Sequence, residues 1–129
     1  MWVHRLSSLA GMTLGLAAAL PFTSLPQHPV HEIQVEARKF EFDPAEIEVT
    51  AGEPVRLILH TADTTHGFAI KGLKIDVEIP KKGGPVTAEF TAPPPGRYQI
   101  ACSEVCGIHH RQMKGALVSV PAHSPQTTR

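Results

Sequence analysis

The sequence is poor in cysteine and in net charge and has no sustained helical pattern, and each shortage excludes a class of protein. Two cysteines among 129 residues are too few for a small domain held together by disulfide bonds. Twelve basic residues balance twelve acidic ones, which argues against a protein that binds nucleic acid by neutralising phosphates. Twelve prolines and ten glycines indicate many turns and few long helices. The length allows one domain.

The balanced total hides an uneven distribution of charge. Residues 31–64 hold eight acidic and three basic residues, whereas residues 65–129 hold four acidic and eight basic ones. This asymmetry has two alternative interpretations. One is two differently solvated faces, and the other is a polarised surface that orients a partner. We favour the first, simpler interpretation from the sequence.

The N-terminal residues are predicted to lie outside the domain, as a signal peptide or signal anchor at residues 1–20. A short head with His4 and Arg5 precedes an apolar run that ends at Leu20, with small residues near its end. This order is typical of a secretory signal peptide. The alternative is membrane anchorage by residues 3–25, because a spanning helix needs about 20 residues. Both interpretations place the domain in the periplasm or on the outer face of the cytoplasmic membrane.

A proline-rich linker at residues 21–30 and a polar tail at residues 122–129 flank the predicted domain, residues 31–121. Within it, apolar and polar residues alternate in short runs separated by turn residues, which predicts half-buried strands. The apolar positions of these runs are Ile33 and Val35, Phe40 and Phe42, Ile47 and Val49, Val55–Leu59, Ile75–Ile79, Val86–Phe90, Tyr98–Cys102, and Val118 and Val120. Seven or eight strands at this spacing predict an all-β sandwich.

One segment near the C-terminal end holds the residues with the most informative chemistry. Cys102, Cys106, His110 and Met113 follow the spacing C-x3-C-x3-H-x2-M. Thiolate, imidazole and thioether groups are soft ligands that suit copper. A second histidine is needed, and His66 is the best candidate because it ends a predicted turn before an apolar segment. Two thiolates that bridge a pair of copper ions would use all five side chains, with a backbone carbonyl as a further ligand.

Other uses of these residues stay open at this point. The two cysteines could form a disulfide bond in an oxidising compartment, although so small a ring stabilises little. Zinc accepts cysteine and histidine, but methionine is a poor zinc ligand. A catalytic cysteine–histidine pair would leave the second cysteine and the methionine without a role.

The segment CSEVCGIHHRQM resembles the copper loop of the dinuclear-copper (CuA) domain of cytochrome c oxidase subunit II. Residues 63–70 resemble that family's upstream histidine segment and residues 73–80 the strand that follows it, so the resemblance covers roughly residues 31–120. It implies a cupredoxin-like Greek-key β-sandwich of seven or eight strands that binds a pair of copper ions. It implies that Glu104 ligates copper through its backbone carbonyl. The other ligands that it implies are His66, Cys102, Cys106, His110 and Met113.

The resemblance also implies partners. These are an electron donor such as a c-type cytochrome and subunit I of a haem–copper oxidase. In the family the carboxylate of the loop glutamate also reaches a magnesium ion at the contact with subunit I, so Glu104 is a candidate magnesium ligand. The chain departs from the family in two ways. It has at most one N-terminal membrane segment, as in a short form of the subunit. In place of the family's tryptophan-containing aromatic stretch it keeps only Phe40 and Phe42.

Three functions follow from the sequence. The first is an exported copper protein of the respiratory chain that transfers electrons from a donor protein to a terminal oxidase or another reductase. The second is a periplasmic copper carrier or oxidase-assembly protein without an electron-transfer role, and the third is a structural sandwich with a disulfide bond. We favour the first. We expect no bond chemistry from the chain alone, so enzymatic activity would require it to be the electron-entry subunit of an oxidase.

Overall fold

The computed structural model describes residues 28–123. The predicted signal peptide or signal anchor, part of the predicted linker and most of the predicted tail lie outside the described residues. Within residues 28–123, no helix is long and apolar enough to cross a membrane.

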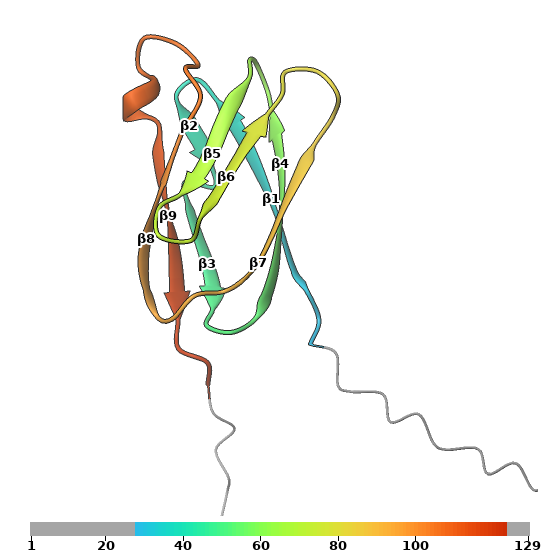
Figure 1. Ribbon diagram of the computed structural model, residues 1–129, viewed down its shortest axis with the longest axis vertical. Helices are drawn as coiled ribbons and strands as arrows, with labels where there is room; N and C mark the ends of the chain where they lie inside the picture. Colours follow the sequence, from blue (N-terminus) through green and yellow to red (C-terminus); the bar gives the residue numbers. More distant parts are fainter. Residues whose placement is uncertain (1–27, 124–129) are drawn as a thin grey trace, which may run out of the picture.

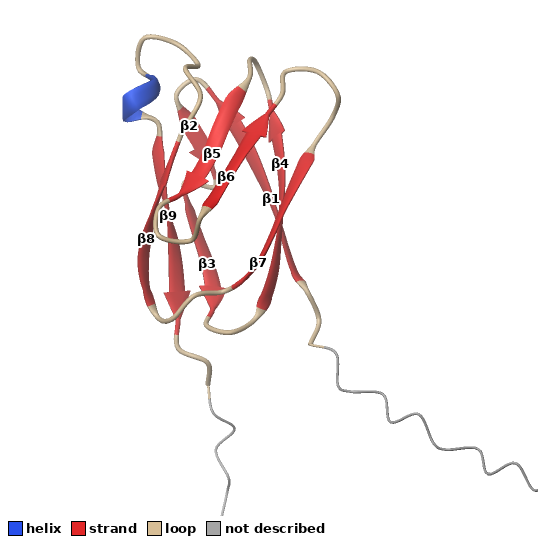
Figure 2. Ribbon diagram, viewed as in Figure 1, coloured by secondary structure: helices blue, strands red, loops and turns tan. Residues whose placement is uncertain are grey.

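Nine β-strands of the described chain form two facing sheets, and Figure 1 shows them as the two layers of a sandwich. The first sheet has the order β2-β1-β4-β7 and consists of β1 (His31–Arg38), β2 (Glu41–Asp43), β4 (Pro54–Thr61) and β7 (Val86–Thr91). The second has the order β3-β9-β8-β5-β6 and consists of β3 (Glu46–Thr50), β5 (His66–Ile70), β6 (Ile75–Ile79), β8 (Gly96–Ala101) and β9 (Lys114–Val120). A short helical turn, η1 (His110–Gln112), precedes β9 (Figure 2). The all-β sandwich predicted from the sequence is confirmed.

Strand β5 is the element that the alternating pattern did not predict. Four of its five residues are buried, so apolar and polar residues do not alternate along it. Phe68 and Ile70 face the core, whereas Gly67 lies beneath the loop after β8 and Ala69 lines a pocket on the outer face. Because its outward-facing positions are glycine and alanine and not polar residues, the sequence of this strand shows no alternation.

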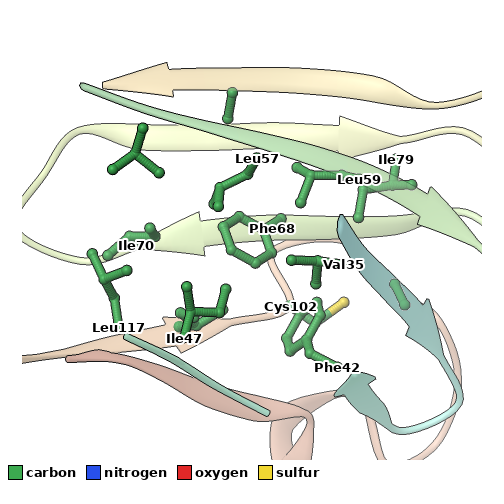
Figure 3. Packing of buried hydrophobic residues seen from close by; sticks show 14 of the residues in the cluster. Val35, Phe42, Ile47, Leu57, Leu59, Phe68, Ile70, Ile79, Cys102 and Leu117 are labelled. Carbon is green, nitrogen blue, oxygen red and sulfur yellow. The ribbon is translucent and has the colours of Figure 1, made fainter. Parts of the chain in front are cut away.

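The core lies between the two sheets and consists of the alternate, inward-facing residues of the strands (Figure 3). Phe42 and Phe68 meet edge to face across it, with ring centroids 5.4 Å apart. Cys102, which directly follows β8, belongs to the same buried cluster. The loop after β8 therefore begins inside the core, and the packed sandwich fixes its first residue.

The turn between β3 and β4 lies at the opposite end of the sandwich from the loop between β8 and β9 (Figure 1). A Glu53 carboxylate oxygen accepts the Thr50 N–H at 2.7 Å and lies 2.8 Å from His31 Nδ1. Burial by itself would raise the pKa of Glu53, but the Thr50 N–H and His31 outweigh it and lower the pKa below its ordinary value. Folding thus stabilises the ionised carboxylate, which joins β1 to this turn.

The substitution Glu53→Gln should lower the free energy of unfolding by about 1 kcal/mol at neutral pH, because an amide is a weaker acceptor than a carboxylate. A carboxyl group whose pKa is lowered by folding stabilises the native state at pH values above its pKa in the unfolded chain. This stabilisation is lost as the pH falls through its pKa in the folded chain. The difference from the parent chain should therefore shrink below about pH 4. Denaturant unfolding at neutral and acidic pH measures it. The exposed Glu48→Gln is the control, and an equal loss in both variants would contradict the role of Glu53.

Candidate metal centre

The loop between β8 and β9 and the start of β5 lie at the same end of the sandwich (Figure 1). Strands β5 and β8 run antiparallel, with Ala69 opposite Ala101. The end of β8 and the beginning of β5 are consequently neighbours. This topology brings His66 and Cys102 together although 35 residues lie between them in the sequence.

Three sulfur atoms and one imidazole gather at this end. A ring nitrogen of His66 and the sulfur atoms of Cys102 and Cys106 all lie within 4.8 Å of one another, and all three residues are buried. The two cysteine Sγ atoms are 3.5 Å apart, and Met113 Sδ is 3.8 Å from Cys106 Sγ. The Glu104 carbonyl oxygen lies 3.0 Å from Cys102 Sγ. Five of the six predicted site residues are thus together.

His110, the sixth, lies beside this group but outside the set of atoms within 4.8 Å. It begins η1, and its Nδ1 atom is buried without a hydrogen-bond partner among the described residues. Together with Cys102 and Met113 it lines a pocket of about 390 Å³. The structure therefore places this histidine at the surface side of the sulfur atoms.

The two cysteines are free thiols in this structure. Their 3.5 Å separation is far longer than the S–S bond of about 2.05 Å in a disulfide. Burial, followed by the proximity of Cys102, raises the pKa of the Cys106 thiol to about 11. Because a metal binds the thiolate form, a metal that occupies this site must displace the proton from Cys106.

Asp63 orients His66, a role that the sequence did not predict. The fully buried His66 ring has Nε2 at 2.7 Å from the Asp63 carboxylate, which also accepts the backbone N–H groups of Lys39 and Thr64. Burial alone would raise the pKa of Asp63, but these three donors outweigh it and lower that pKa. The ionised carboxylate therefore accepts a hydrogen bond from Nε2–H. Nδ1, which has no partner among the described residues, is left free to bind a metal.

Gly67 allows the loop to lie directly on β5. A Cβ atom at this position would be 2.6 Å from the backbone nitrogen of Glu104 and 2.8 Å from that of Ser103. Only glycine permits so close an approach of two backbones. The Ser103 hydroxyl also donates to Asp76 of β6 at 2.6 Å, so the loop is attached to two strands of the second sheet.

Phe40 supports the loop from the side of the first sheet. Its ring meets His109 edge to face with centroids 5.2 Å apart. It also packs against Gly107, where an added Cβ would be 2.9 Å from the ring. The exposed His109 therefore contacts Phe40, whereas its neighbour His110 lines the pocket beside the sulfur atoms.

The donor set fits a soft metal ion. It combines two thiols, a thioether, imidazole and a backbone carbonyl, which suit copper better than hard cations. The buried, unpartnered Nδ1 atoms of His66 and His110 support this conclusion, because buried polar atoms in native proteins almost always have a partner. Both nitrogen atoms lie on residues that the sequence predicted to bind a metal.

Residues 10–119 match the family described as the cupredoxin-like domain. The chain belongs to this family. This cupredoxin-like domain is 34% identical over 88 residues to cytochrome c oxidase subunit 2 of Thermus thermophilus, a match that covers 68% of the chain and 64% of that relative. The chain thus spans less than two thirds of the relative's length. The predicted similarity to cytochrome c oxidase subunit II is confirmed.

Two solved structures resemble the cupredoxin-like domain. A chain of a haem–copper terminal oxidase dimer is 28% identical with a TM-score of 0.61, and the match covers 70% of this chain and 65% of that one. The periplasmic domain of subunit II of cytochrome oxidase from Bradyrhizobium japonicum is 20% identical with a TM-score of 0.63, over 76% and 88% of the two chains. At this identity the second similarity shows the fold alone.

The substitution Gly67→Ala should displace the loop from β5, because its Cβ would overlap the backbone of Ser103 and Glu104. We expect a loss of about 1–3 kcal/mol in the free energy of unfolding, the usual cost of overpacking. We also expect faster alkylation of Cys102 and Cys106 in the native chain, measured with iodoacetamide, because the displaced loop would expose both thiols.

Gly52→Ala is the matched control for this experiment. Gly52 has φ +84° and open space around it, in the turn at the far end of the sandwich. Alanine there should cost about 1 kcal/mol through backbone strain and leave the thiol reactivity unchanged. Equal thiol reactivity in the two variants would show that the contact at Gly67 does not hold the loop in place.

Proposed function

We propose that this chain is an exported copper protein that transfers electrons through a dinuclear CuA centre. The observation that supports it most directly is the pair of buried, unbonded cysteine sulfur atoms 3.5 Å apart with an imidazole nitrogen within 4.8 Å of both. Two thiolates this close can bridge two metal ions, whereas a single ion would leave a soft donor unused. The similarity to cytochrome c oxidase subunit 2 supports the same assignment.

In this proposal each residue of the centre has a distinct role. Cys102 and Cys106 would hold the copper ions through their thiolates, His66 and His110 through their imidazole nitrogens, and Met113 weakly through its thioether. The backbone carbonyl of Glu104 completes the set. When bound, a pair of copper ions supplies a one-electron redox couple.

The fold suits this chemistry because it restricts movement of the ligands. His66 begins a strand enclosed by two others and is held by Asp63, and Cys102 belongs to the core. The Cys102 N–H donates to the Met113 carbonyl at 3.1 Å, which closes the loop at its base. Electron transfer is fast where ligands rearrange little, and a packed sandwich supplies that rigidity.

The proposal extends to the surroundings of the protein. The electron donor would be a c-type cytochrome or a similar protein, and the acceptor a haem–copper oxidase core or another reductase. Residues 1–20 would direct export or anchor the chain, residues 21–30 would link them to the domain at residues 31–121, and residues 122–129 would form a tail. The Glu104 side chain, which is exposed, would be free to bind magnesium at a subunit contact.

Copper loading of the purified chain tests the central proposal. We expect a pair of copper ions per chain by elemental analysis. The electron paramagnetic resonance signal of the mixed-valence state should show coupling of one unpaired electron to two equivalent copper nuclei. Cys106→Ser should abolish this signal, because it removes one of the two bridging thiolates.

Two results would overturn it. One copper ion per chain, or no mixed-valence signal, would exclude the dinuclear centre. Rapidly exchanging Cu(I) without a reversible redox couple would instead support a copper carrier or assembly protein.

The role of Asp63 gives a second prediction. In Asp63→Asn, an amide NH₂ group would face at least one of the three donors and the remaining oxygen would be a weaker acceptor than a carboxylate, so His66 would be held less firmly. Loss of such an outer partner should weaken copper binding by about 10–100-fold, measured by competition with a chelator. Asp76→Asn, which alters the hydrogen bond to Ser103, is the control and should change copper affinity much less. Equal affinities for Asp63→Asn and the parent chain would contradict this role.

A further inference from the structure

A basic rim borders the candidate metal centre where it comes closest to the surface. The pocket of about 390 Å³ beside Cys102, His110 and Met113 is also lined by Lys71, Arg111 and Lys114. We call these three basic residues the basic rim. Its members come from three separate parts of the second-sheet layer: the end of β5, the loop with η1 and the start of β9. The fold therefore brings positive charges together beside the predicted metal ligands.

Small residues form the floor of the pocket between these charges. Ala69 of β5 and Ala101 of β8 are direct cross-strand partners, and Lys114 of β9 is the next residue along the same row. Side chains in one such row point to the same face of a sheet. Because two adjacent positions in this cross-strand row are alanine, the longer basic side chains extend beyond the floor of the pocket.

The charges of the basic rim are not neutralised within the described chain. No carboxylate of residues 28–123 lies within 4.0 Å of a charged nitrogen of the rim, and all three residues are exposed. Asp76 lies in the same row as Ala69, but its carboxylate accepts the Ser103 hydroxyl. Glu104 of the loop and Glu78, the cross-strand partner of Gly67, are exposed acidic residues near the pocket but do not line it. The charged residues that line the pocket itself are thus all basic.

Arginines elsewhere on the described surface are arranged differently. Arg38, Arg56 and Arg97 each lie within 4.0 Å of at least one carboxylate. Arg111, beside the pocket, has no such partner among the described residues. Among the described arginines, Arg111 is therefore the one whose charge is left available to a partner.

Apolar side chains are exposed on the same loop. Val105 and Ile108 have exposed fractions of 80% and 90%, the highest of the exposed large hydrophobic residues in the described chain. Val105 directly precedes Cys106, and Ile108 is two residues before His110, so their Cα atoms lie within about 4 and 7 Å of those of the ligands. Exposed apolar residues bordered by charged ones are typical of a surface that binds another protein.

We propose that the basic rim, with Val105 and Ile108, docks the acidic surface of the redox partner protein. The inference rests on the proposed electron-transfer function and specifies the partner. In the docked complex the partner's haem iron is oxidised from ferrous to ferric, and its electron passes to the copper-loaded chain with no bond made or broken. Complementary charge raises the rate of association, while the apolar residues form a contact free of water. A small anion would use the charges but not the exposed apolar side chains.

Two forms of one probe protein test this inference. Mitochondrial ferrocytochrome c is basic, and succinylation of its lysines makes the same haem protein acidic. Stopped-flow mixing with the copper-loaded chain measures the rate of electron transfer from each. At low ionic strength the acidic form should react about tenfold faster or more, and added salt should reduce the difference.

Charge reversal identifies the surface responsible. The triple variant Lys71→Glu, Arg111→Glu, Lys114→Glu should invert the preference, so that the basic form reacts faster. The control variant Lys81→Glu, Lys82→Glu, Arg97→Glu makes the same change in net charge on exposed residues away from the pocket, and it should keep the original order. A parent chain that prefers the basic probe, or a rim variant that keeps the parent's order, would overturn the proposal.

A binding measurement separates this inference from the proposed function. If neither probe transfers electrons to the chain, the electron-transfer function fails. Nuclear magnetic resonance then still decides the docking surface, with isotope-labelled chain and the acidic probe both kept reduced. Shifts confined to Lys71, the loop and Lys114 support the proposal. Shifts confined to the first sheet, or none, overturn it.

Discussion

The backbone of Ser103 and Glu104 lies so close to Gly67 that a side chain would not fit between them. The rest of the candidate metal centre depends on this contact. Gly67 follows His66 and Ser103 follows Cys102, so the close approach of the two backbones also determines the distance between the two predicted ligands. The core beneath Cys102 and the hydrogen bond from Ser103 to Asp76 stabilise the same arrangement.

This arrangement means that the sandwich, and not the loop alone, positions the ligands. Asp63 holds one nitrogen of His66 and leaves the other free, while Phe40 packs against the loop from the first sheet. A site built on packed strands can change its charge with little change in shape, which favours electron transfer over bond chemistry. The same construction leaves the outer edge of the loop exposed, where its apolar and basic residues meet solvent.

The sequence predicted the sandwich because most of its strands have one solvated face. Such a face appears in the sequence as an alternation of apolar and polar residues. It did not predict β5, whose outward-facing positions are Gly67 and Ala69 and not polar residues. The spacing of cysteine, histidine and methionine predicted the side chains that the structure brings together, although their role as ligands stays a prediction. It could not reveal the roles of Asp63, Gly67 and Phe40, because these depend on contacts between distant segments. For the same reason the uneven charge, interpreted from the sequence as simple solvation, gave no sign that the basic rim would gather beside the ligands.

Anomalous X-ray diffraction from crystals of the copper-loaded chain, recorded at the copper absorption edge, tests the central claim most directly. The account predicts two copper peaks between the sulfur atoms of Cys102 and Cys106, with the loop packed against Gly67 as described above. His66 and His110 should each approach one peak through Nδ1, the atom without a partner among the described residues. A single copper peak, or a disulfide bond between the two cysteines in place of copper, would contradict it.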